Sequence, residues 1–261
     1  MKTIVIDGNN LNLDDFIKIS KFNYKIKLTE EAIKRVKASR KLVDKYVEEN
    51  KTIYGITTGF GKFSETTINS KQAMRLQRNL IMSHACGVGK PLKEEFVRGI
   101  MLLRINALAK GYSGIRLLTL NTLIQMLNKG VHPVIPEKGS LGASGDLAPL
   151  AHMALVIVGE GEAYYKGERL SGRKAMEMAK IRPIELTSKE GLALINGTQV
   201  MTSIGSFAVY EAINLSKTAD ISASLTIEAL NGIIDSYDNK INIVRPHEGQ
   251  INTANNLLAL L

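Results

Sequence analysis

Apolar residues recur at helical spacing over most of the chain, and this pattern predicts a mainly α protein. The longest such stretch contains no proline and runs from Thr198 to Leu230, which predicts one long helix of a bundle. The expected helices cover residues 29–50, 71–83, 91–107, 113–130, 146–158, a short segment after 187, 198–230 and 249–261.

Several helix ends carry their own sequence signals. Thr29 is predicted to cap the first of these helices, and Gly130 is predicted to end another in a left-handed turn. Pro91 suits a first helical turn, and Ser113 suits the cap of the next helix. Thr187 and Glu190 have the spacing of a capping box.

Where the helical period fails, the residues predict loops and small β elements. Residues 2–7 alternate enough for a short strand, and residues 161–170 indicate a hairpin. Residues 52–67 and 132–142 are rich in glycine or proline and are expected to be irregular.

Composition narrows the class of protein. The chain has 261 residues, 44% hydrophobic and 23% charged, which is ordinary for a globular protein. Its net charge of +9 is spread along amphipathic segments, which favours a solvated basic surface over a nucleic-acid site. Such a field would also attract an anionic substrate. Cys86 is the only cysteine, and there is no export signal or long apolar run, so we expect a cytoplasmic protein with no membrane partner.

The candidate chemistry lies in residues 139–152, G-S-L-G-A-S-G-D-L-A-P-L-A-H. At their centre are Ala143, Ser144 and Gly145, whose backbone can react with itself. The amide nitrogen of Gly145 can attack the carbonyl carbon of Ala143 and close a five-membered ring, because glycine has no Cβ to crowd the attack. Loss of two waters, one taking the Ser144 hydroxyl, would leave an electrophile made from protein alone.

A bare Ala-Ser-Gly is expected in roughly one chain in ten of this size, but the flanking D-L-A-P-L-A-H makes chance a poor explanation. With these flanks the chain resembles the aromatic amino acid ammonia-lyases, and the histidine ammonia-lyases most closely. In that family the triplet becomes, autocatalytically, the prosthetic group MIO (4-methylidene-imidazol-5-one). The resemblance runs from about Thr3 to Leu261 and includes K-E-G-L-A-L-I-N-G-T-Q and R-P-H-E-G-Q.

The resemblance implies a fold and a division of the chain. The fold would be the mainly α, L-aspartase/ammonia-lyase-like one, with small β elements. Residues 1–195 would form the MIO-bearing domain, and residues 196–261 would begin the central bundle of long helices.

The resemblance also implies a catalytic set for ammonia elimination, which needs an electrophile for the amine and a base for the β proton. Beside Ala143, Ser144 and Gly145, it implies Tyr54 in Y-G-I-T-T-G-F-G as the base and Asn196 as a residue touching MIO. From the residues alone, Tyr54 is more simply a tyrosine of a glycine-rich surface loop, because its hydroxyl becomes a base only under positive potential.

Four further site residues are expected, two for substrate binding and two as supports of MIO. The family places a histidine against the substrate ring where this chain has His84, and a pliable loop containing Gly61 would close over the substrate. Asp146 would help the ring form, and Gln199 would support the asparagine. By local sequence alone, His84 could instead end a helix, and Asp146 could cap the helix that follows it.

Other chemistries fit these residues less well. G-A-S-G-D nearly matches the G-x-S-x-G of serine hydrolases, but Asp146 stands where glycine is required, and the prolines before it exclude a central strand. G-F-G-K lacks the Ser or Thr that follows the lysine of a phosphate loop. Cys86 and His84 lie two residues apart and would not meet on a helix. The four histidines show no ligand spacing, so no metal site is expected.

The chain has about half the length typical of the family. The remaining half normally supplies a second essential tyrosine, a carboxylate-anchoring arginine, a glutamine and the glutamate that marks histidine specificity. The resemblance implies an amino acid substrate, and Ser83-His84 with the match of residues 159–199 favours histidine, giving trans-urocanate. Phenylalanine or tyrosine lyases and aminomutases are the alternatives. The apolar residues 257–261 favour packing against a partner. A split enzyme in a homo- or hetero-oligomer with a C-terminal-half polypeptide, a fragment, and a truncated inactive product remain open.

Overall fold

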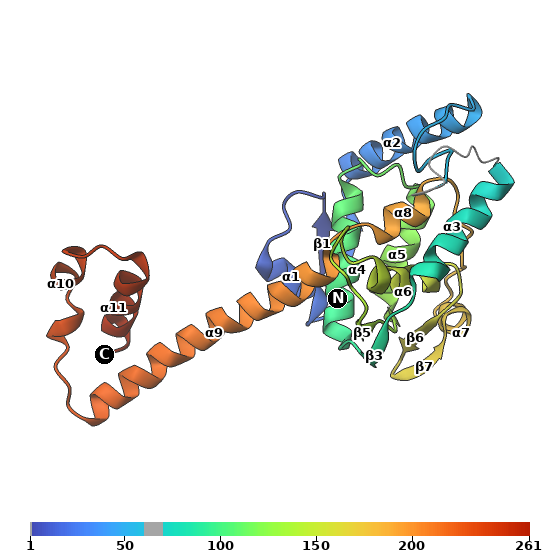
Figure 1. The fold of residues 1–261 in the computed structure, drawn as a ribbon. Coiled ribbons are helices and arrows are strands. Elements are labelled where there is room, and N and C mark those ends of the chain that lie inside the picture. The colour runs from blue at the N-terminus through green and yellow to red at the C-terminus, as the bar shows by residue number, and fades with distance from the viewer. Residues whose placement is uncertain (1, 60–69) are drawn as a thin grey trace. The chain divides into compact units, whose positions relative to one another are not determined.

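The computed structural model describes residues 2–59 and 70–261, without the side chains of residues 70–72 (Figure 1). The chain is mainly α, as predicted, with short strands between the helices. It forms two compact units, Met1–Gly205 and Ser206–Leu261. The division expected at residue 195 stays a prediction.

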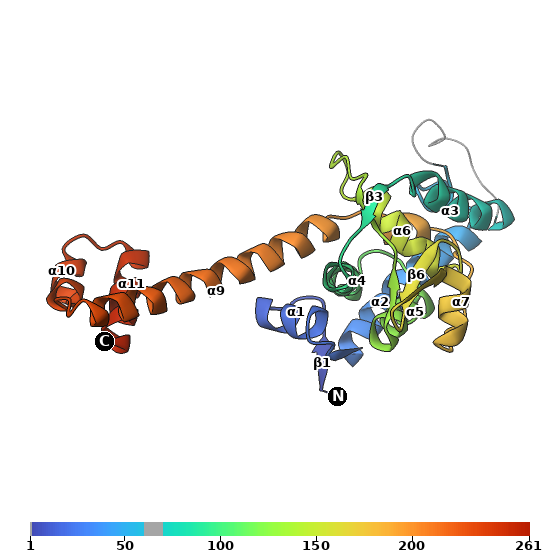
Figure 2. The ribbon, with the colours of Figure 1, turned by 90° about the horizontal axis from the view of Figure 1, so that it is seen from below.

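The first unit packs its helices around α4 and α6 (Figure 2). Helix α4 contacts α1, α2 and α5, and helix α6 contacts α3, α5 and α8. Apolar side chains such as Ile100, Leu123 and Leu150 are fully buried there, and each contributes about 1.5–3 kcal/mol through its removal from water. The helices of this unit are α1 (Leu13–Ser20), α2 (Glu30–Glu48), α3 (Ser70–His84), α4 (Glu94–Ala109), α5 (Leu117–Lys129), α6 (Leu147–Ile157), α7 (Gly172–Met178), α8 (Glu190–Ile195) and the beginning of α9 (Gln199–Ala229).

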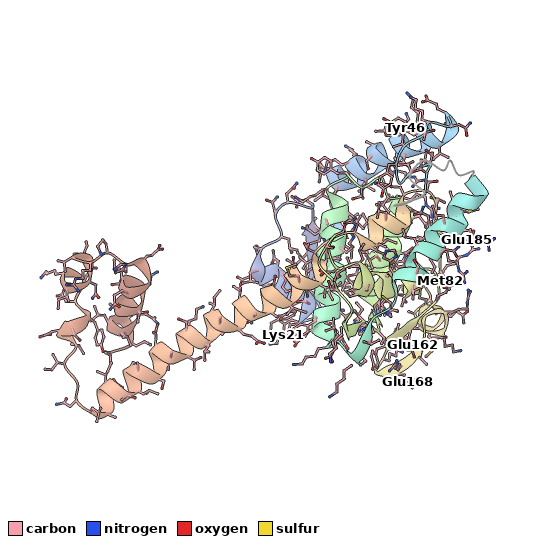
Figure 3. All side chains as sticks on the ribbon, viewed as in Figure 1. Lys21, Tyr46, Met82, Glu162, Glu168 and Glu185 are labelled. Carbon is pink, nitrogen blue, oxygen red and sulfur yellow. The ribbon has the colours of Figure 1, made fainter. Side chains whose placement is uncertain are left out.

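The described strands form three small sheets at the edges of this helical core. β1 (Thr3–Ile6) pairs in parallel with β2 (Lys25–Leu28), and β3 (Val88–Pro91) pairs antiparallel with β5 (Pro136–Lys138). β4 (Val131–Pro133) joins the hairpin of β6 (Glu162–Tyr165) and β7 (Glu168–Ser171). Glu162 and Glu168 lie on the two strands of that hairpin and are both exposed (Figure 3).

Most elements predicted from the sequence are confirmed. The first strand and the hairpin form, and Thr29 caps α2 by accepting a 3.1 Å hydrogen bond from the Ala32 amide. Gly130 ends α5 in the left-handed conformation, with φ at 77°. The long apolar stretch forms the single helix α9, and the last predicted helix is α11 (Glu248–Leu260). Periodicity located these helices because most of them bury one face only.

Three local predictions were wrong, each because of a tertiary contact. Pro91 ends β3 and faces Pro136, and α4 begins only at Glu94. Ser113 does not cap α5, which begins at Leu117. The amide of Arg116, the residue before that helix, donates instead to the carboxylate of Glu190 at the start of α8. The proline-rich residues 132–142 are partly paired, as β4 and β5, rather than fully irregular.

The second unit holds the rest of α9 with η2 (Asp235–Tyr237), α10 (Asn239–Ile243) and α11. Ala254 and Leu257 of α11 are buried, and the Asn256 side chain donates a 2.7 Å hydrogen bond to Asp220 of α9. Many large apolar side chains of this unit remain exposed, among them Leu225, Leu230, Ile233 and Val244.

One helical stretch of the described chain, Glu190–Ala229, is long and apolar enough to cross a membrane, with a mean hydropathy of 1.2 in its best window. The sequence was expected to hold no such stretch. A core helix of a soluble protein passes the same test of length and composition, so this stretch is weak evidence for a membrane. The expectation of no membrane partner stays a prediction.

Candidate active site

The triplet Ala143-Ser144-Gly145 lies in a bend between β5 and α6. Gly145 has φ at +89°, a conformation that L side chains rarely adopt. A Cβ at this position would also collide with the carbonyl of Gly197. That same carbonyl accepts a 2.6 Å hydrogen bond from the Asp146 amide. The bend is therefore held against the turn between α8 and α9, and its third position requires glycine.

Asp146 is only 3% exposed and ties the bend to α9. Its Oδ2 accepts hydrogen bonds from the amides of Val200 at 2.9 Å and Met201 at 3.0 Å. Its Oδ1 accepts the Ser140 hydroxyl at 2.8 Å. Asp146 is the N-cap residue of α6, as local sequence allowed, but its side chain makes no capping bond there and instead caps α9. The positive end of the α9 dipole stabilises this buried carboxylate.

Asn196 is the predicted site residue that the structure brings to the triplet. Its Nδ2 lies 3.4 Å from Ser144 Oγ, close enough for a long hydrogen bond. Asn196 follows the last residue of α8 with extended backbone angles, so its side chain leaves the helix at the turn toward α9. The amide group is thus placed beside the Ser144 hydroxyl.

Arg104 of α4 holds the other side of this turn. Its Nη1 donates to the Asn196 carbonyl and to Gln199 Oε1, both at 2.9 Å, and its Nη2 donates to the Ala193 carbonyl. Arg104 is 4% exposed, and burial lowers the pKa of its guanidinium to about 10. It therefore still carries its charge at neutral pH. Gln199, a predicted support, contacts this arginine.

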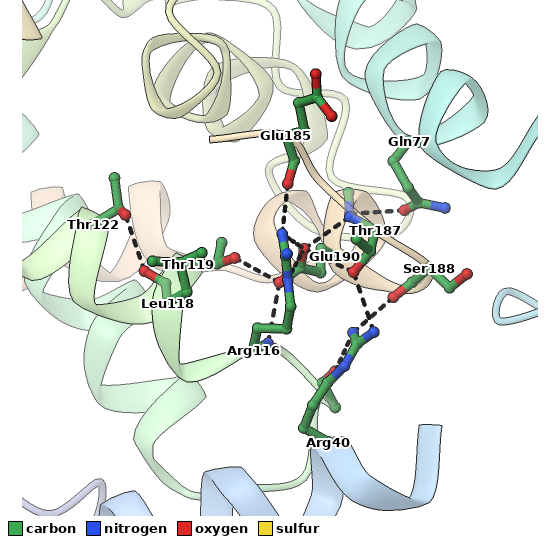
Figure 4. Close-up of polar contacts among 12 residues, drawn as sticks. Arg40, Gln77, Arg116, Leu118, Thr119, Thr122, Glu185, Thr187, Ser188 and Glu190 are labelled. Carbon is green, nitrogen blue, oxygen red and sulfur yellow. Dashed lines mark hydrogen bonds and ion pairs between the residues drawn. The ribbon is translucent and has the colours of Figure 1, made fainter. Parts of the chain in front are cut away.

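The N-terminal end of α8 is held by a second buried network (Figure 4). Glu190 is fully buried and accepts hydrogen bonds from Thr119 Oγ1 at 2.6 Å and from Arg116 Nε at 2.9 Å. It also accepts the Thr187 amide at 2.9 Å, which realises one arm of the predicted capping box. Gln77 of α3 accepts the Gly191 amide at 2.8 Å. Helix α8 is thereby fixed at both ends, and Asn196 is the residue it presents.

His84 ends α3, as local sequence allowed, and is half-buried. Its Nδ1 lies 2.8 Å from the Leu80 carbonyl, which can only accept, so this contact requires a proton on Nδ1. The segment after His84 is tied to α6, because the Gly87 amide donates to His152 Nε2 at 3.0 Å. Burial lowers the pKa of His152, which favours the neutral ring that this bond requires.

Tyr54 is 59% exposed in the turn that follows α2. It takes part in a further interaction, so it is not an isolated side chain. Gly61 lies outside the described residues. The roles of both stay predictions.

The described residues contain no group of three or more His, Cys, Asp or Glu side chains that could hold a metal ion. His132 is the most strongly perturbed histidine. Burial and the neighbouring charge of Arg98 lower its pKa to about 3. It belongs to a framework contact beside α4 and not to the triplet, since its Nε2 faces Arg98 at 3.1 Å.

Sequence reasoning missed Arg104, Gly197 and Ser140 as parts of this site. Arg104 could have been found, because a charged residue within the apolar run I-M-L-L-R-I-N-A-L-A needs a hydrogen-bond partner inside the protein. Gly197 was visible only as half of an Asn-Gly turn. Nothing in the sequence pointed to Ser140.

Comparison with known proteins adds to this geometry. A family model described as aromatic amino acid lyase matches residues 11–261. The chain is 67% identical, over 100% of its length, to histidine ammonia-lyase of Alkaliphilus oremlandii (strain OhILAs), and covers 52% of that protein. It is 61% identical, again over 100% of its length, to histidine ammonia-lyase of Alkaliphilus metalliredigens (strain QYMF), and covers 52% of it. The chain thus spans about half the length of the curated relatives it matches.

Solved structures agree on the fold. Histidine ammonia-lyase from Trypanosoma cruzi is similar with a TM-score of 0.94 and 39% identity, over 100% of this chain and 51% of that chain. Tyrosine aminomutase from Streptomyces globisporus is similar with a TM-score of 0.92 and 39% identity, over 98% of this chain and 48% of that chain. These two structures share the same identity with the chain, although one is a histidine ammonia-lyase and the other a tyrosine aminomutase.

Proposed function

Because the chain belongs to the aromatic amino acid lyase family, we propose that it is the electrophile-bearing half of a histidine ammonia-lyase, which eliminates ammonia from L-histidine to give trans-urocanate. The observation that carries this proposal is the bend at residues 143–145 held against Asn196 and Gly197. Identity of 67% to a curated histidine ammonia-lyase supports the choice of reaction.

The residues present fit the MIO group that the family implies. A ring closed between Ala143 and Gly145 needs a tight bend and no side chain at its third position. The bend is present, and Gly145 lies where the Gly197 carbonyl leaves no room for a Cβ. When formed, the ring would supply an electrophile for the substrate amine.

The chain's own side chains have distinct tasks in this proposal. Asn196 binds the Ser144 hydroxyl and later the amine of the substrate. Asp146 fixes the bend by accepting a hydrogen bond from the Val200 amide of α9. Tyr54, once its hydroxyl has lost a proton, accepts the proton from the substrate β carbon. Gly61 belongs to the loop that excludes water, and Gln199 supports the asparagine through Arg104.

Substrate choice rests on two observations. Ser83-His84 matches the pattern of the histidine enzymes, and His84, whose Nδ1 faces the Leu80 carbonyl, has its Nε2 on the other side of the ring for contact with an imidazole. The curated relatives at 67% and 61% identity are both histidine ammonia-lyases. A tyrosine aminomutase shares 39% identity, and this keeps an aromatic substrate as the second candidate.

We propose that activity needs the half of the enzyme that this sequence lacks. The triplet is open to solvent here, with Leu141 beside it 90% exposed, whereas elimination chemistry requires water to be excluded. Exposed apolar side chains in the second unit, such as Leu225 and Ile233, also require cover. A C-terminal-half polypeptide, within a homo- or hetero-oligomer, is the proposed cover.

Ring formation is tested by intact mass spectrometry, on the chain alone and on the chain co-expressed with the C-terminal half of the Alkaliphilus oremlandii relative. We expect a mass lower than the sequence mass by two waters, localised to the peptide containing Ala143 to Gly145. Gly145→Ala should abolish this loss. Gly167→Ala is the matched control, because it has a similar φ of +85° but open space around its Cβ. An unshifted mass in both preparations would contradict the proposal.

Catalysis is tested by following urocanate absorbance when L-histidine is added, with L-phenylalanine and L-tyrosine as competing substrates. Activity is expected only when the C-terminal half is present, and only with histidine. Full activity of the isolated chain would refute the need for the second half. Preference for tyrosine or phenylalanine would mean that the chain belongs to a tyrosine or phenylalanine enzyme of the family and not to a histidine enzyme.

A further inference from the structure

The turn between α8 and α9 is held from two opposite sides. On one side, Asp146 donates its amide hydrogen to the Gly197 carbonyl and caps the amides of Val200 and Met201. On the other side, the Arg104 guanidinium bonds the carbonyls of Ala193 and Asn196. The Asn196 side chain emerges between these two supports.

Arg104 differs from an ordinary buried arginine, because among the described residues no carboxylate forms an ion pair with it. Its partners are the carbonyl end of α8 and the Gln199 amide, which carry only partial negative charge. Its Nε is buried and has no hydrogen-bond partner in the described part of the chain. Such burial of a charge costs folding free energy.

We infer that Arg104 is a positioning residue for the proposed lyase site. Its guanidinium fixes the Asn196 peptide through the carbonyl, and thereby sets the distance between Asn196 Nδ2 and Ser144 Oγ. The adjacent Gly197 has no room for a side chain, since a Cβ there would collide with Arg104 and Gln199. The turn is therefore built around the guanidinium. This inference rests on the proposed function for its chemical consequence, which is efficient ring formation.

The same helix provides a matched control. Arg98 is 3% exposed and also donates to the carbonyl ends of helices, at Ile19, Ser20 and Leu127. Burial also lowers its pKa. In the described part of the chain, the hydrogen bonds of Arg98 go to Ile19, Ser20, Leu127 and His132, and none reaches residues 140–146 or 196–201. If the buried arginines of α4 acted on stability alone, substitutions of Arg98 and of Arg104 should therefore have the same effect.

The first measurement is the rate of two-water loss, by intact mass, in Arg104→Met, Arg104→Lys and Arg98→Met proteins co-expressed with the C-terminal half. Each rate is divided by the folded fraction from circular dichroism. Arg104→Met is expected to slow the loss on the order of tenfold to a hundredfold. Arg104→Lys should recover part of it, because one cationic donor remains. Arg98→Met should match the parent. Equal rates for Arg104→Met and Arg98→Met would overturn the inference.

The second measurement does not depend on ring formation. Hydrogen exchange of the peptide covering residues 193–201 should quicken in Arg104→Met and stay at the parent rate in Arg98→Met. If the parent never loses two waters, the proposed function fails, and hydrogen exchange still decides the positioning role. If the parent matures while exchange and maturation are unchanged in Arg104→Met, only the positioning inference fails.

Discussion

Helix α4 carries two buried arginines that both donate hydrogen bonds to carbonyls at helix ends, one away from the candidate site and one beside it. Arg98 and Arg104 both neutralise carbonyls at helix ends, where backbone acceptors lack intrahelical partners. Around Arg98 the remaining partner is His132, which in turn lies 3.4 Å from the exposed carboxylate of Glu94. Around Arg104 the remaining partner is Gln199. Asn196, whose carbonyl Arg104 binds, contacts Ser144 of the triplet through its side chain.

The difference shows how one structural device can serve a framework or a site. The Arg98 cluster includes a titratable histidine and joins α1, α4 and α5. The Arg104 cluster contains no histidine and joins α4 to the α8–α9 turn. We therefore expect the stability contributed by the Arg98 cluster to depend on pH. We expect mutations in the Arg104 cluster to change ring formation. Four predictions, from the largest expected effect to the smallest, test this division.

The largest effect is expected from releasing α8 at the end opposite Arg104. Glu190→Ala leaves Arg116, Thr119 and Thr187 without their shared buried acceptor. The free energy of unfolding should fall by about 3–5 kcal/mol, measured by urea denaturation. Glu162→Ala is the control, because it removes an exposed pair with Arg169 and should cost at most about 1 kcal/mol. Similar losses in both variants would contradict the importance of the buried network.

The second effect is a pH dependence of the Arg98 cluster. His132 has its pKa lowered to about 3, so the unfolded chain binds more protons than the folded chain between about pH 6.5 and 3. Its contribution is fully present above this window and is lost as the pH falls through it. Between pH 6.5 and 4.5 the parent should lose about 2–3 kcal/mol more than His132→Gln, measured by urea denaturation. A pH profile that is the same in both proteins would remove the contrast.

The third effect concerns the cap of α9. Asp146→Ala removes the acceptor of the Val200 and Met201 amides and should cost about 1–2 kcal/mol. Asn12→Ala removes the cap of α1, away from the triplet, at a similar cost. Two-water loss should be impaired in Asp146→Ala alone. Equal maturation of these two variants would mean that the cap acts on stability only.

The smallest effect is expected at the loop after His84. His152→Leu leaves the Gly87 amide without its acceptor and should cost about 1 kcal/mol. Hydrogen exchange should quicken in residues 85–88 and not in residues 193–201. His247→Leu, at an exposed position, is the control and should leave both segments unchanged. Faster exchange of residues 193–201 in His152→Leu would show that the two supports of the site are coupled.

The sequence determined the elements and the chemistry that are local. Helical periodicity located α2 and α3, because an amphipathic stretch shows its period without its partners. Helices α6 and α9 were recognised instead as sustained apolar stretches. The triplet was recognisable because ring closure involves only neighbouring residues. The caps of α5 and α9 could not be predicted, because their acceptors, Glu190 and Asp146, come from distant segments. The same reason hid Arg104.

What the tertiary structure decided is which polar groups meet. The sequence by itself established that a ring could close at residues 143–145, since that depends on the size of three side chains. Only the packing of α4, α6 and α8 places Asn196 beside Ser144 and Arg104 behind it. Buried polar groups must find partners, and the partners that satisfy them lie far away in sequence. Their choice is therefore a property of the folded chain.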